Sequence, residues 1–281
     1  MSHDAGPRTP EQWKRILRSR GIRPERSMGQ NFLVESKVVG EIVRIAEVIP
    51  HDTALEIGPG LGVLTRELAR TGATVVAIEL DRELKRFLDT DLASLANVRI
   101  VERDAMYVDV NELVGGMRYK LVANLPYSTG TAIVRRFLEH PTPPASMTVM
   151  LQREVAERMV GEPPDMSLLA LSMRIHATGE IAMHVPPDVF YPAPKVESAV
   201  VHLVLRDVPL VDRQEEAVLF RLATMAFQRK RKTLSNGLAQ GLGKAKGEID
   251  SNLRAIGIDP VRRPQTLSID EWIAISRTIV P

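Results

Sequence analysis

The stretch Asn124-Leu125-Pro126-Tyr127 combines residue types that could hold a flat heterocycle bearing an amine. Residues 119–123 before it form an apolar run, which predicts a buried strand. Open α/β sheets bind their ligands at the carboxyl ends of strands, where this stretch would lie. The Asn124 side-chain oxygen and the Leu125 carbonyl can accept two hydrogen bonds from one exocyclic amine, and the Tyr127 ring can stack on the heterocycle. The sequence therefore predicts a binding site here.

A glycine-rich turn between a predicted strand and a predicted helix indicates a second binding element. Residues 53–57 predict the strand, and Gly58 and Gly60 follow it, so a ligand can approach the backbone. Glu79 ends the next predicted strand about 20 residues later, where a carboxylate can bind ribose hydroxyls. This pattern alone is weak, because a nicotinamide-binding Rossmann enzyme would show the same pairing.

Two further carboxylates favour a cationic nucleoside over a nicotinamide dinucleotide. Glu56 lies inside the strand before the glycines, and Asp104 follows a third predicted strand, with Ala105 beside it. Acidic side chains near one site would repel a pyrophosphate, whereas they suit the positively charged S-adenosylmethionine. As the alternative, Asp104 only caps the turn that follows it.

Two segments carry aromatic residues that could either contact a ligand or pack in the core. Gln30-Asn31-Phe32-Leu33 precedes a helix predicted at residues 35–48, and it is typical either of a turn with a buried Phe32 or of a ligand-clamping loop. Residues 190–198 contain two prolines that would hold an extended loop. Phe190 is therefore a candidate for the second face of a sandwiched base, with core packing as the alternative.

Cysteine is absent, which excludes disulfides, thiolate metal sites and a cysteine nucleophile. The last exclusion matters because carbon methylation of pyrimidines usually needs such a nucleophile. The six histidines have no metal-ligand spacing, so no metal site is predicted. No apolar run approaches the ~20 residues of a membrane span, and the amino-terminus lacks the apolar core of a signal peptide. We therefore expect a cytoplasmic protein.

The charge is unevenly distributed along the chain. The net charge is only +2, but the segment from Arg206 onward holds 13 Lys and Arg against 9 Asp and Glu, an excess of four. It includes the unbroken run Arg229-Lys230-Arg231-Lys232. Such a run is often a solvated helix face, but beside a base-binding site it favours contact with nucleic-acid phosphates.

Apolar runs and helical periods alternate as far as residue 205, which predicts an α/β fold with a doubly wound, mostly parallel sheet. Strands are expected at residues 53–57, 74–79, 98–102, 119–123, 147–151, 181–185 and 198–205. Beyond residue 205 the pattern is only helical, with helices near residues 214–229, 233–240, 247–255 and 269–279. We predict a large domain at residues 1–206 and a small all-α domain at residues 207–281.

Several motifs occur in a fixed order along the chain. They are Gln30-Asn31-Phe32-Leu33, Glu56-Ile57-Gly58-Pro59-Gly60, Ile78-Glu79-Leu80-Asp81, Asp104-Ala105, Asn124-Leu125-Pro126-Tyr127, Gln152-Arg153-Glu154-Val155-Ala156, residues 190–198, Arg231-Lys232-Thr233-Leu234 and Gly257-Ile258-Asp259-Pro260. Each is moderately specific, and the ordered set is highly specific. From about residue 21 to residue 276 the chain resembles the KsgA/RsmA-type ribosomal RNA adenine dimethyltransferases.

The resemblance implies an enzyme that transfers methyl groups from S-adenosylmethionine to two adjacent adenosines. These adenosines lie in the 3′-terminal hairpin loop of small-subunit (16S) ribosomal RNA, and each receives two methyl groups during 30S ribosome biogenesis. The resemblance also implies a class I methyltransferase (Rossmann-like) sheet with one antiparallel strand at its edge, and a helical carboxyl-terminal domain. We expect a monomer that acts on RNA away from membranes.

The resemblance assigns roles to matching positions. Asn31 and Leu33 would border the donor, Glu79 would hold its ribose hydroxyls, and Asp104 would meet its adenine. The residues predicted to bind the donor are Gln30, Asn31, Leu33, Glu56, Gly58, Gly60, Glu79, Leu80, Asp104, Ala105 and Asn124. The residues predicted to act on the target adenine are Asn124, Leu125, Tyr127 and Phe190, and those predicted to bind RNA are Arg229, Lys230, Arg231 and Lys232.

The chain departs from the family pattern beside the predicted target pocket. Ser128-Thr129 stands where the family usually has Asn-Ile, which could alter how the base is positioned. Two alternatives remain open. One is the sister group that dimethylates an adenosine of large-subunit ribosomal RNA, although Arg231-Lys232-Thr233-Leu234 and Gly257-Ile258-Asp259-Pro260 favour the small-subunit group. The other is a non-catalytic relative that binds nucleic acid or assists ribosome assembly.

Overall fold

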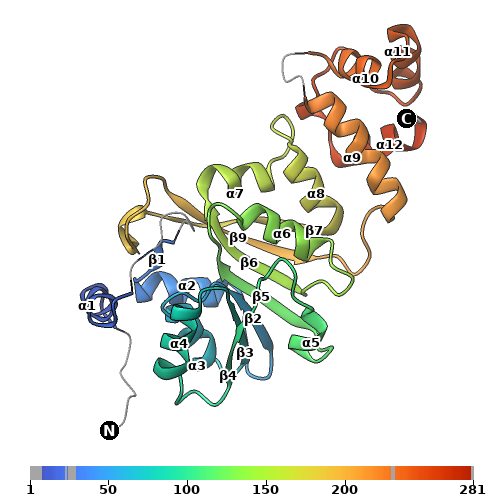
Figure 1. Ribbon diagram of the computed structural model, residues 1–281. Helices are drawn as coiled ribbons and strands as arrows, with labels where there is room; N and C mark the ends of the chain where they lie inside the picture. Colours follow the sequence, from blue (N-terminus) through green and yellow to red (C-terminus); the bar gives the residue numbers. More distant parts are fainter. Residues whose placement is uncertain (1–7, 23, 25–29, 229–231, 280–281) are drawn as a thin grey trace. The chain divides into compact units, whose positions relative to one another are not determined.

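The structure, a computed structural model, describes residues 8–22, 24, 30–228 and 232–279 of the chain (Figure 1). Its internal contacts divide the chain into two compact units. The first contains Met1–Ala156 and Gly179–Leu205, and the second contains Glu157–Thr178 and Arg206–Pro281. The sequence predicts a single boundary at residue 206, whereas the structure also groups Glu157–Thr178 with the second unit.

A seven-stranded sheet forms the centre of the first unit, in the order β4-β3-β2-β5-β6-β9-β7. The strands are β2 (Thr53–Ile57), β3 (Thr74–Glu79), β4 (Val98–Glu102), β5 (Tyr119–Asn124), β6 (Ser146–Gln152), β7 (Ala177–Val185) and β9 (Ser198–Leu205). From β4 to β6 all neighbours are parallel, which confirms the predicted sheet. The antiparallel strand was expected at the edge, but β9 pairs with β6 inside the sheet and β7 forms the edge.

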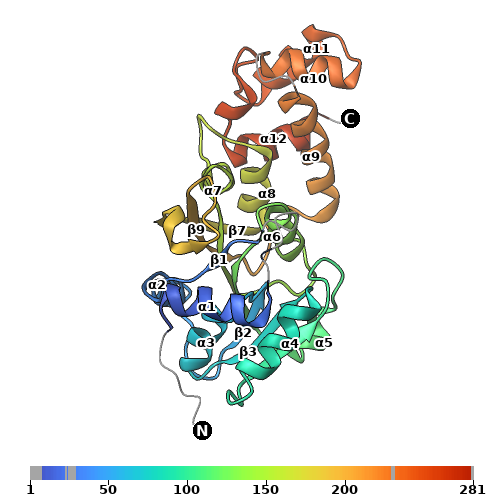
Figure 2. The same ribbon diagram turned by 60° about the vertical axis from the view of Figure 1, so that its left-hand side comes forward.

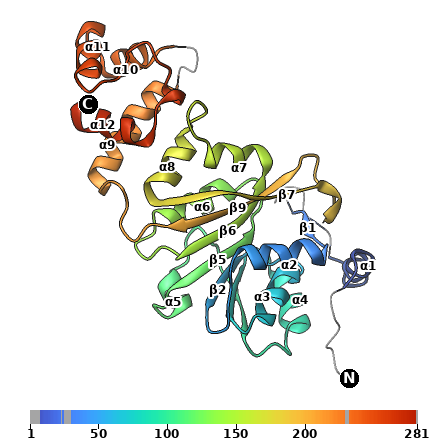
Figure 3. The ribbon, with the colours of Figure 1, turned by 180° about the vertical axis from the view of Figure 1, so that it is seen from behind.

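Helices cover both faces of this sheet. Figures 1 and 3 show α3 (Val63–Arg70) and α4 (Arg82–Asp91) on one face, with α5 (Val110–Val114) and α6 (Gly130–Leu138) on the other. This arrangement follows from right-handed crossovers, because the chain moves outward from β2 to β4 and then returns to β5 on the opposite side. The strand order reverses between β2 and β5, which creates the crevice where such sheets bind ligands.

The amino-terminal helix α1 (Pro10–Arg20) begins with a capping box formed by Thr9 and Gln12. Helix α1 is labelled in Figures 1 and 2. Its Trp13 and Leu17 are buried in a cluster with Phe87 of α4. After it come α2 (Ser36–Ile45), which is shorter than predicted, and, further along the chain, α7 (Arg153–Val160). Among the described residues, no helix is long and apolar enough to cross a membrane.

Two short segments that the sequence left as loops form a small sheet of their own. Strand β1 (Phe32–Leu33) pairs antiparallel with β8 (Phe190–Tyr191), which follows the 3-10 turn η2 (Pro187–Val189). Leu33 lies opposite Phe190 in this pair. The pairing joins two motifs that are far apart in the sequence.

The second unit is helical and has its own apolar core. It contains α8 (Leu168–His176), α9 (Arg213–Phe227), α10 (Leu234–Leu242), α11 (Lys246–Ala255), the 3-10 turn η3 (Pro264–Thr266) and α12 (Ile269–Thr278). Leu171 of α8, Leu222 of α9 and Trp272 of α12 belong to one buried cluster. Because α8 is apolar on most of its surface, it contributes to this core although it precedes β7 in the chain.

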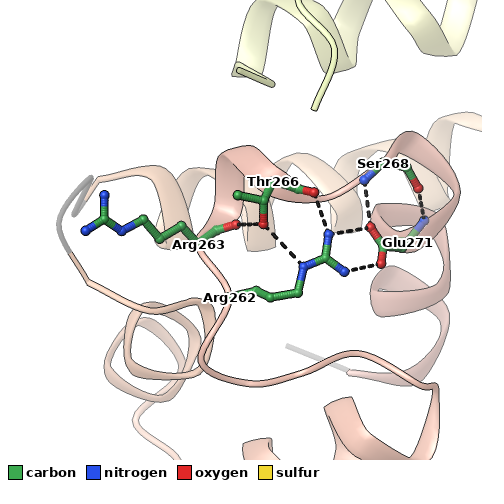
Figure 4. A network of polar contacts seen from close by, with 5 residues as sticks. All are labelled: Arg262, Arg263, Thr266, Ser268 and Glu271. Atoms are coloured by element: carbon green, nitrogen blue, oxygen red, sulfur yellow. Dashed lines mark hydrogen bonds and ion pairs between the residues drawn. The ribbon is translucent and has the colours of Figure 1, made fainter. Parts of the chain in front are cut away.

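A polar network fixes the start of α12 within this unit (Figure 4). The Arg262 guanidinium pairs with both carboxylate oxygens of Glu271 and donates to the Thr266 hydroxyl. Glu271 also accepts a hydrogen bond of 2.8 Å from the backbone N–H of Ser268, and the Ser268 hydroxyl caps the helix in return. Burial alone would raise the pKa of Glu271, but Arg262 and the Ser268 N–H together hold it below its ordinary value.

Candidate active site

A cavity of about 400 Å³ lies at the carboxyl ends of the central strands of the first unit. The loops that follow β2, β3, β4 and β5 all contribute to its lining, together with residues 30–33. It therefore occupies the crevice at which the strand order reverses. The predicted donor-binding residues that line it are Gln30, Asn31, Leu33, Glu56, Gly58, Gly60, Glu79, Leu80, Asp104, Ala105 and Asn124.

The turn after β2 is shaped by glycines. Gly58 has a φ of +66° and its N–H donates to the Ile78 carbonyl at 2.9 Å, which ties the turn to β3. Gly60 has a φ of +56°, and a Cβ added there would lie only 2.9 Å from the Phe32 ring. A side chain at Gly60 would therefore be strained and would collide with Phe32, so glycine is needed to keep this side of the cavity open.

Two buried carboxylates line the cavity from β2 and β3. Glu56 is only 1% exposed, and its Oε2 atom has no hydrogen-bond partner among the described residues. Burial raises the pKa of Glu56 to about 8, the Thr65 hydroxyl opposes this rise, and the charge of Glu79 adds to it. Burial also raises the pKa of Glu79, although backbone N–H groups, including that of Asp81 at 2.9 Å, act in the other direction. Ionising these buried carboxyls costs free energy, and a bound cation would compensate that cost.

Asp104 lies at the cavity and also fixes the local backbone. Its carboxylate accepts a hydrogen bond of 2.8 Å from the Met106 N–H, so the turn-capping alternative and the cavity position both hold. Arg136 of α6 donates to the carbonyls of Met106, at 2.6 Å, and Val108. One guanidinium thus holds the loop that presents Asp104 and Ala105 to the cavity.

Asn124 is the last residue of β5, and its side chain is oriented by a backbone contact. The Asn124 Nδ2 atom donates to the Asn31 carbonyl at 3.3 Å. The nitrogen end of the amide therefore faces residues 30–33, and the oxygen end faces the other way. Leu125 is buried, with its N–H bonded to the Met150 carbonyl at 3.2 Å. The stretch that carries the predicted acceptor groups is thus held firmly by the sheet.

Tyr127 lines the same cavity and is anchored at the far end of its ring. Its hydroxyl lies 2.6 Å from the Ser198 hydroxyl. Burial raises the pKa of Tyr127, although the bond to Ser198 opposes the rise. Pro126, Ser128 and Thr129 complete this side of the cavity, so the residues that depart from the family pattern do border it.

Phe190 is not among the residues that line the cavity, and most of the predicted RNA-binding run lies outside the described residues. Phe190 is buried at 4% exposure in a core cluster with Met150, and it is not among the cavity residues. Its position opposite Leu33, which does line the cavity, leaves its stacking role a prediction. Of the basic run, Arg229, Lys230 and Arg231 lie outside the described residues, and Lys232 is exposed.

Sequence reasoning missed much of the apolar lining and one polar contact. Val63, Leu84 and Ile133 line the cavity, but apolar residues of this kind look like any core residue in a sequence. Leu80, which the sequence did select, is 57% exposed, so it offers an apolar surface to a ligand at the rim. The contact of Ser198 with Tyr127 had one available signal, because Ser198 closes the motif at residues 190–198.

Comparison with known proteins gives a consistent result across nearly the whole chain. The family model described as ribosomal RNA adenine dimethylase matches residues 22–280. A relative from Moorella thermoacetica is 42% identical over 282 residues, covering 96% of this chain and 98% of the relative. Another from Dehalococcoides mccartyi is 40% identical over 269 residues, covering 95% and 92%. Both are named ribosomal RNA small subunit methyltransferase A.

Solved structures with the same architecture include two enzymes of related description. The 23S rRNA methyltransferase ErmE is similar with a TM-score of 0.72 and 26% identity, over 88% of this chain and 99% of that one. A dimethyladenosine transferase from Plasmodium falciparum gives a TM-score of 0.73 over 86% and 94%, and at 21% identity it shows a shared fold.

Proposed function

Because the chain belongs to the ribosomal RNA adenine dimethylase family, we propose that it dimethylates two adjacent adenosines of small-subunit ribosomal RNA, with S-adenosylmethionine as the donor. One observation carries the proposal: Asn124 and Tyr127 line the same cavity as Glu56, Glu79 and Asp104. The proposed target is the 3′-terminal hairpin loop within the 30S subunit or its precursor, in the cytoplasm. We also propose that the protein acts as a monomer.

The cavity residues fit S-adenosylmethionine. The bound donor supplies a methyl group on a positively charged sulfur, and it also carries an amino group and an adenosine. Glu56, whose buried Oε2 atom has no partner among the described residues, would compensate positive charge once it is ionised, and Glu79 would hold the ribose hydroxyls. Asp104 and the exposed surface of Leu80 would contact the adenine. A dinucleotide pyrophosphate would meet the same acids and be repelled, which disfavours the nicotinamide alternative.

The acceptor side would work mainly by positioning. The exocyclic nitrogen of adenine is a poor nucleophile, because its lone pair is delocalised into the ring. If the Asn124 side-chain oxygen and the Leu125 carbonyl accept its two hydrogens, the lone pair is freed and aimed at the methyl group. Tyr127 would stack on the extruded base, an interaction typically worth ~1–3 kcal/mol. The methylated amine is acidic enough to lose its proton to water, so no strong base is needed.

The choice of ribosomal subunit rests on the comparisons. Relatives named for the small subunit share 40% to 42% of their residues with this chain, whereas ErmE, named for 23S rRNA, shares 26%. We therefore favour the small subunit. Incubation of the protein with each purified, unmethylated subunit, followed by mass mapping of methylated adenosines, distinguishes the two. Methylation of large-subunit RNA alone would overturn the proposal.

Asn124→Ala tests the acceptor chemistry. We expect the variant to bind the donor with affinity close to that of the wild type and to lose about 100-fold or more in methyl transfer, as when an oriented hydrogen-bonding group is removed. Asn111→Ala, which removes an exposed amide from α5 of the same unit, is the matched control. Near-normal turnover of Asn124→Ala on immature small subunits would contradict the mechanism.

A further inference from the structure

The serine at the start of β9 contacts the aromatic residue of the proposed acceptor site. The Ser198 Oγ atom lies 2.6 Å from the Tyr127 hydroxyl, a short distance for a hydrogen bond between hydroxyls. Ser198 itself is fully buried, at 0% exposure, and does not line the cavity. Any effect of Ser198 on the cavity is therefore exerted through the tyrosine ring.

The backbone around Ser198 is fixed from both sides. Ser198 pairs with Gln152 at the end of the antiparallel β6–β9 ladder, and the carbonyl of Glu197 accepts a hydrogen bond of 3.0 Å from the Arg153 N–H. The segment that leads into Ser198 begins with β8, which is held by β1. A hydroxyl on such a backbone is a fixed point to which a neighbouring side chain can be tied.

A tyrosine ring that borders a cavity is otherwise restrained only at its base. Rotation about χ1 would carry the Tyr127 hydroxyl away from Ser198, so the bond between them opposes that rotation. The hydroxyl oxygen lies on the χ2 axis, so rotation about χ2 is opposed only through the preference of a phenolic O–H for the plane of its ring. At the ordinary tyrosine pKa of 10.0 this hydroxyl is already protonated near neutral pH, and burial raises the pKa of Tyr127 further, so the hydroxyl can donate to Ser198. The ring is thus held in place before any base arrives, which lowers the entropy lost on stacking.

We propose that Ser198 is a positioning residue for methyl transfer, because it fixes the ring of Tyr127 in the orientation that stacks on the target adenine. This inference rests on the proposed function. A merely structural role would instead change the stability of the protein without changing turnover at saturating substrate. The two roles are therefore separable by experiment.

Kinetics of three variants form the first test. Ser198→Ala and Tyr127→Phe should each reduce kcat on small subunits about tenfold, with the donor Kd within twofold of the wild type. The double variant should be no worse than either single variant within about twofold, because both changes break the same bond. Ser146→Ala, which removes a serine hydroxyl at the other end of the β6–β9 ladder, is the matched control and should leave kcat unchanged.

Two kinetic outcomes would overturn the inference. One is a kcat of Ser198→Ala within twofold of the wild type, and the other is a double variant whose loss is the product of the single losses. An inactive wild-type protein would instead count against the proposed function. For that case a second measurement tests the ring alone.

Fluorine NMR of protein labelled with 3-fluorotyrosine reports ring order without any substrate. The chain has only four tyrosines, and the signal of Tyr127 is the one that disappears in Tyr127→Phe. In Ser198→Ala this signal should shift and narrow, because the ring gains freedom, while the signals of the other tyrosines stay in place. An unchanged Tyr127 signal in Ser198→Ala would overturn the inference whatever the enzyme methylates.

Discussion

The buried carboxyl of Glu56 should make the free protein less stable as the pH rises. Its pKa is raised from the ordinary 4.5 to about 8, mainly by burial, with Thr65 opposing and the charge of Glu79 adding. In the unfolded chain the group loses its proton near pH 4.5, whereas in the folded chain it keeps the proton to about pH 8. The folded state binds more protons in this window, so its stability falls as the pH rises through it and changes little beyond it.

The size of this loss of stability follows from the pH range between the two pKa values. Each pH unit within it is worth up to about 1.4 kcal/mol, so the penalty at pH 7 amounts to about 3 kcal/mol relative to pH 4.5. Glu56→Gln keeps the size of the side chain and removes its titration. From pH 5 to pH 8 the variant should therefore gain stability relative to the wild type. The difference in melting temperature between Glu56→Gln and the wild type should be larger at pH 7 than at pH 4.5, by on the order of 10 °C in favour of the variant.

The assay is a set of thermal or urea unfolding curves of both proteins across this pH range, without ligand. Glu67→Gln, which removes a surface carboxylate from α3, is the matched control. Donor affinity measured by calorimetry should change in the opposite direction, because Glu56→Gln removes a carboxyl that is proposed to lose its proton and compensate the bound cationic donor. The variant should therefore bind the donor more weakly. Parallel stability curves for wild type and Glu56→Gln would refute the reasoning.

Two further predictions concern the second unit. Glu271→Gln should lower the free energy of unfolding by about 1 kcal/mol at neutral pH. The difference from the wild type should vanish in acid, because a carboxyl with a lowered pKa loses its contribution to stability as it becomes protonated. Unfolding curves of the two proteins that still differ in acid would contradict this. Replacing Arg229, Lys230, Arg231 and Lys232 with Ala should weaken RNA binding, and the slope of log affinity against log salt should fall in magnitude by about three. An unchanged slope would remove the run from the RNA interface.

The parts of the fold that the sequence predicts are those with strong local signals. Strands β2 to β6 are short apolar runs between turn residues, and their carboxyl ends carry Glu56, Glu79, Asp104 and Asn124 at the shared cavity. Such signals need no knowledge of distant contacts, because all parallel strands of one sheet end at the same edge. Family resemblance then supplied the chemical roles.

Other features depend on contacts between distant residues and give no local signal. The β1–β8 pair consists of two-residue strands, too short to show a period, and each partner alone looks like a loop. From the sequence, Phe190 could either contact a ligand or pack in the core. In the structure β8 pairs with β1, and Phe190 is buried. Similarly, the predicted boundary at residue 206 assigns residues 168–176 to the large domain, whereas the apolar surface of α8 packs in the other unit.

The second unit is built from two separate stretches of the chain, which limits where the protein can be truncated. A fragment that starts at residue 207 would lack α8, whose Leu171 and Ile175 are fully buried in the core of that unit. Each such side chain contributes about 1.5–3 kcal/mol when buried, a large share of the ~5–15 kcal/mol that holds a typical domain together. The excised fragment would thus expose an apolar surface and tend to aggregate. During synthesis, by the same reasoning, α8 leaves the ribosome early and must wait for α9 and α12 before it can pack.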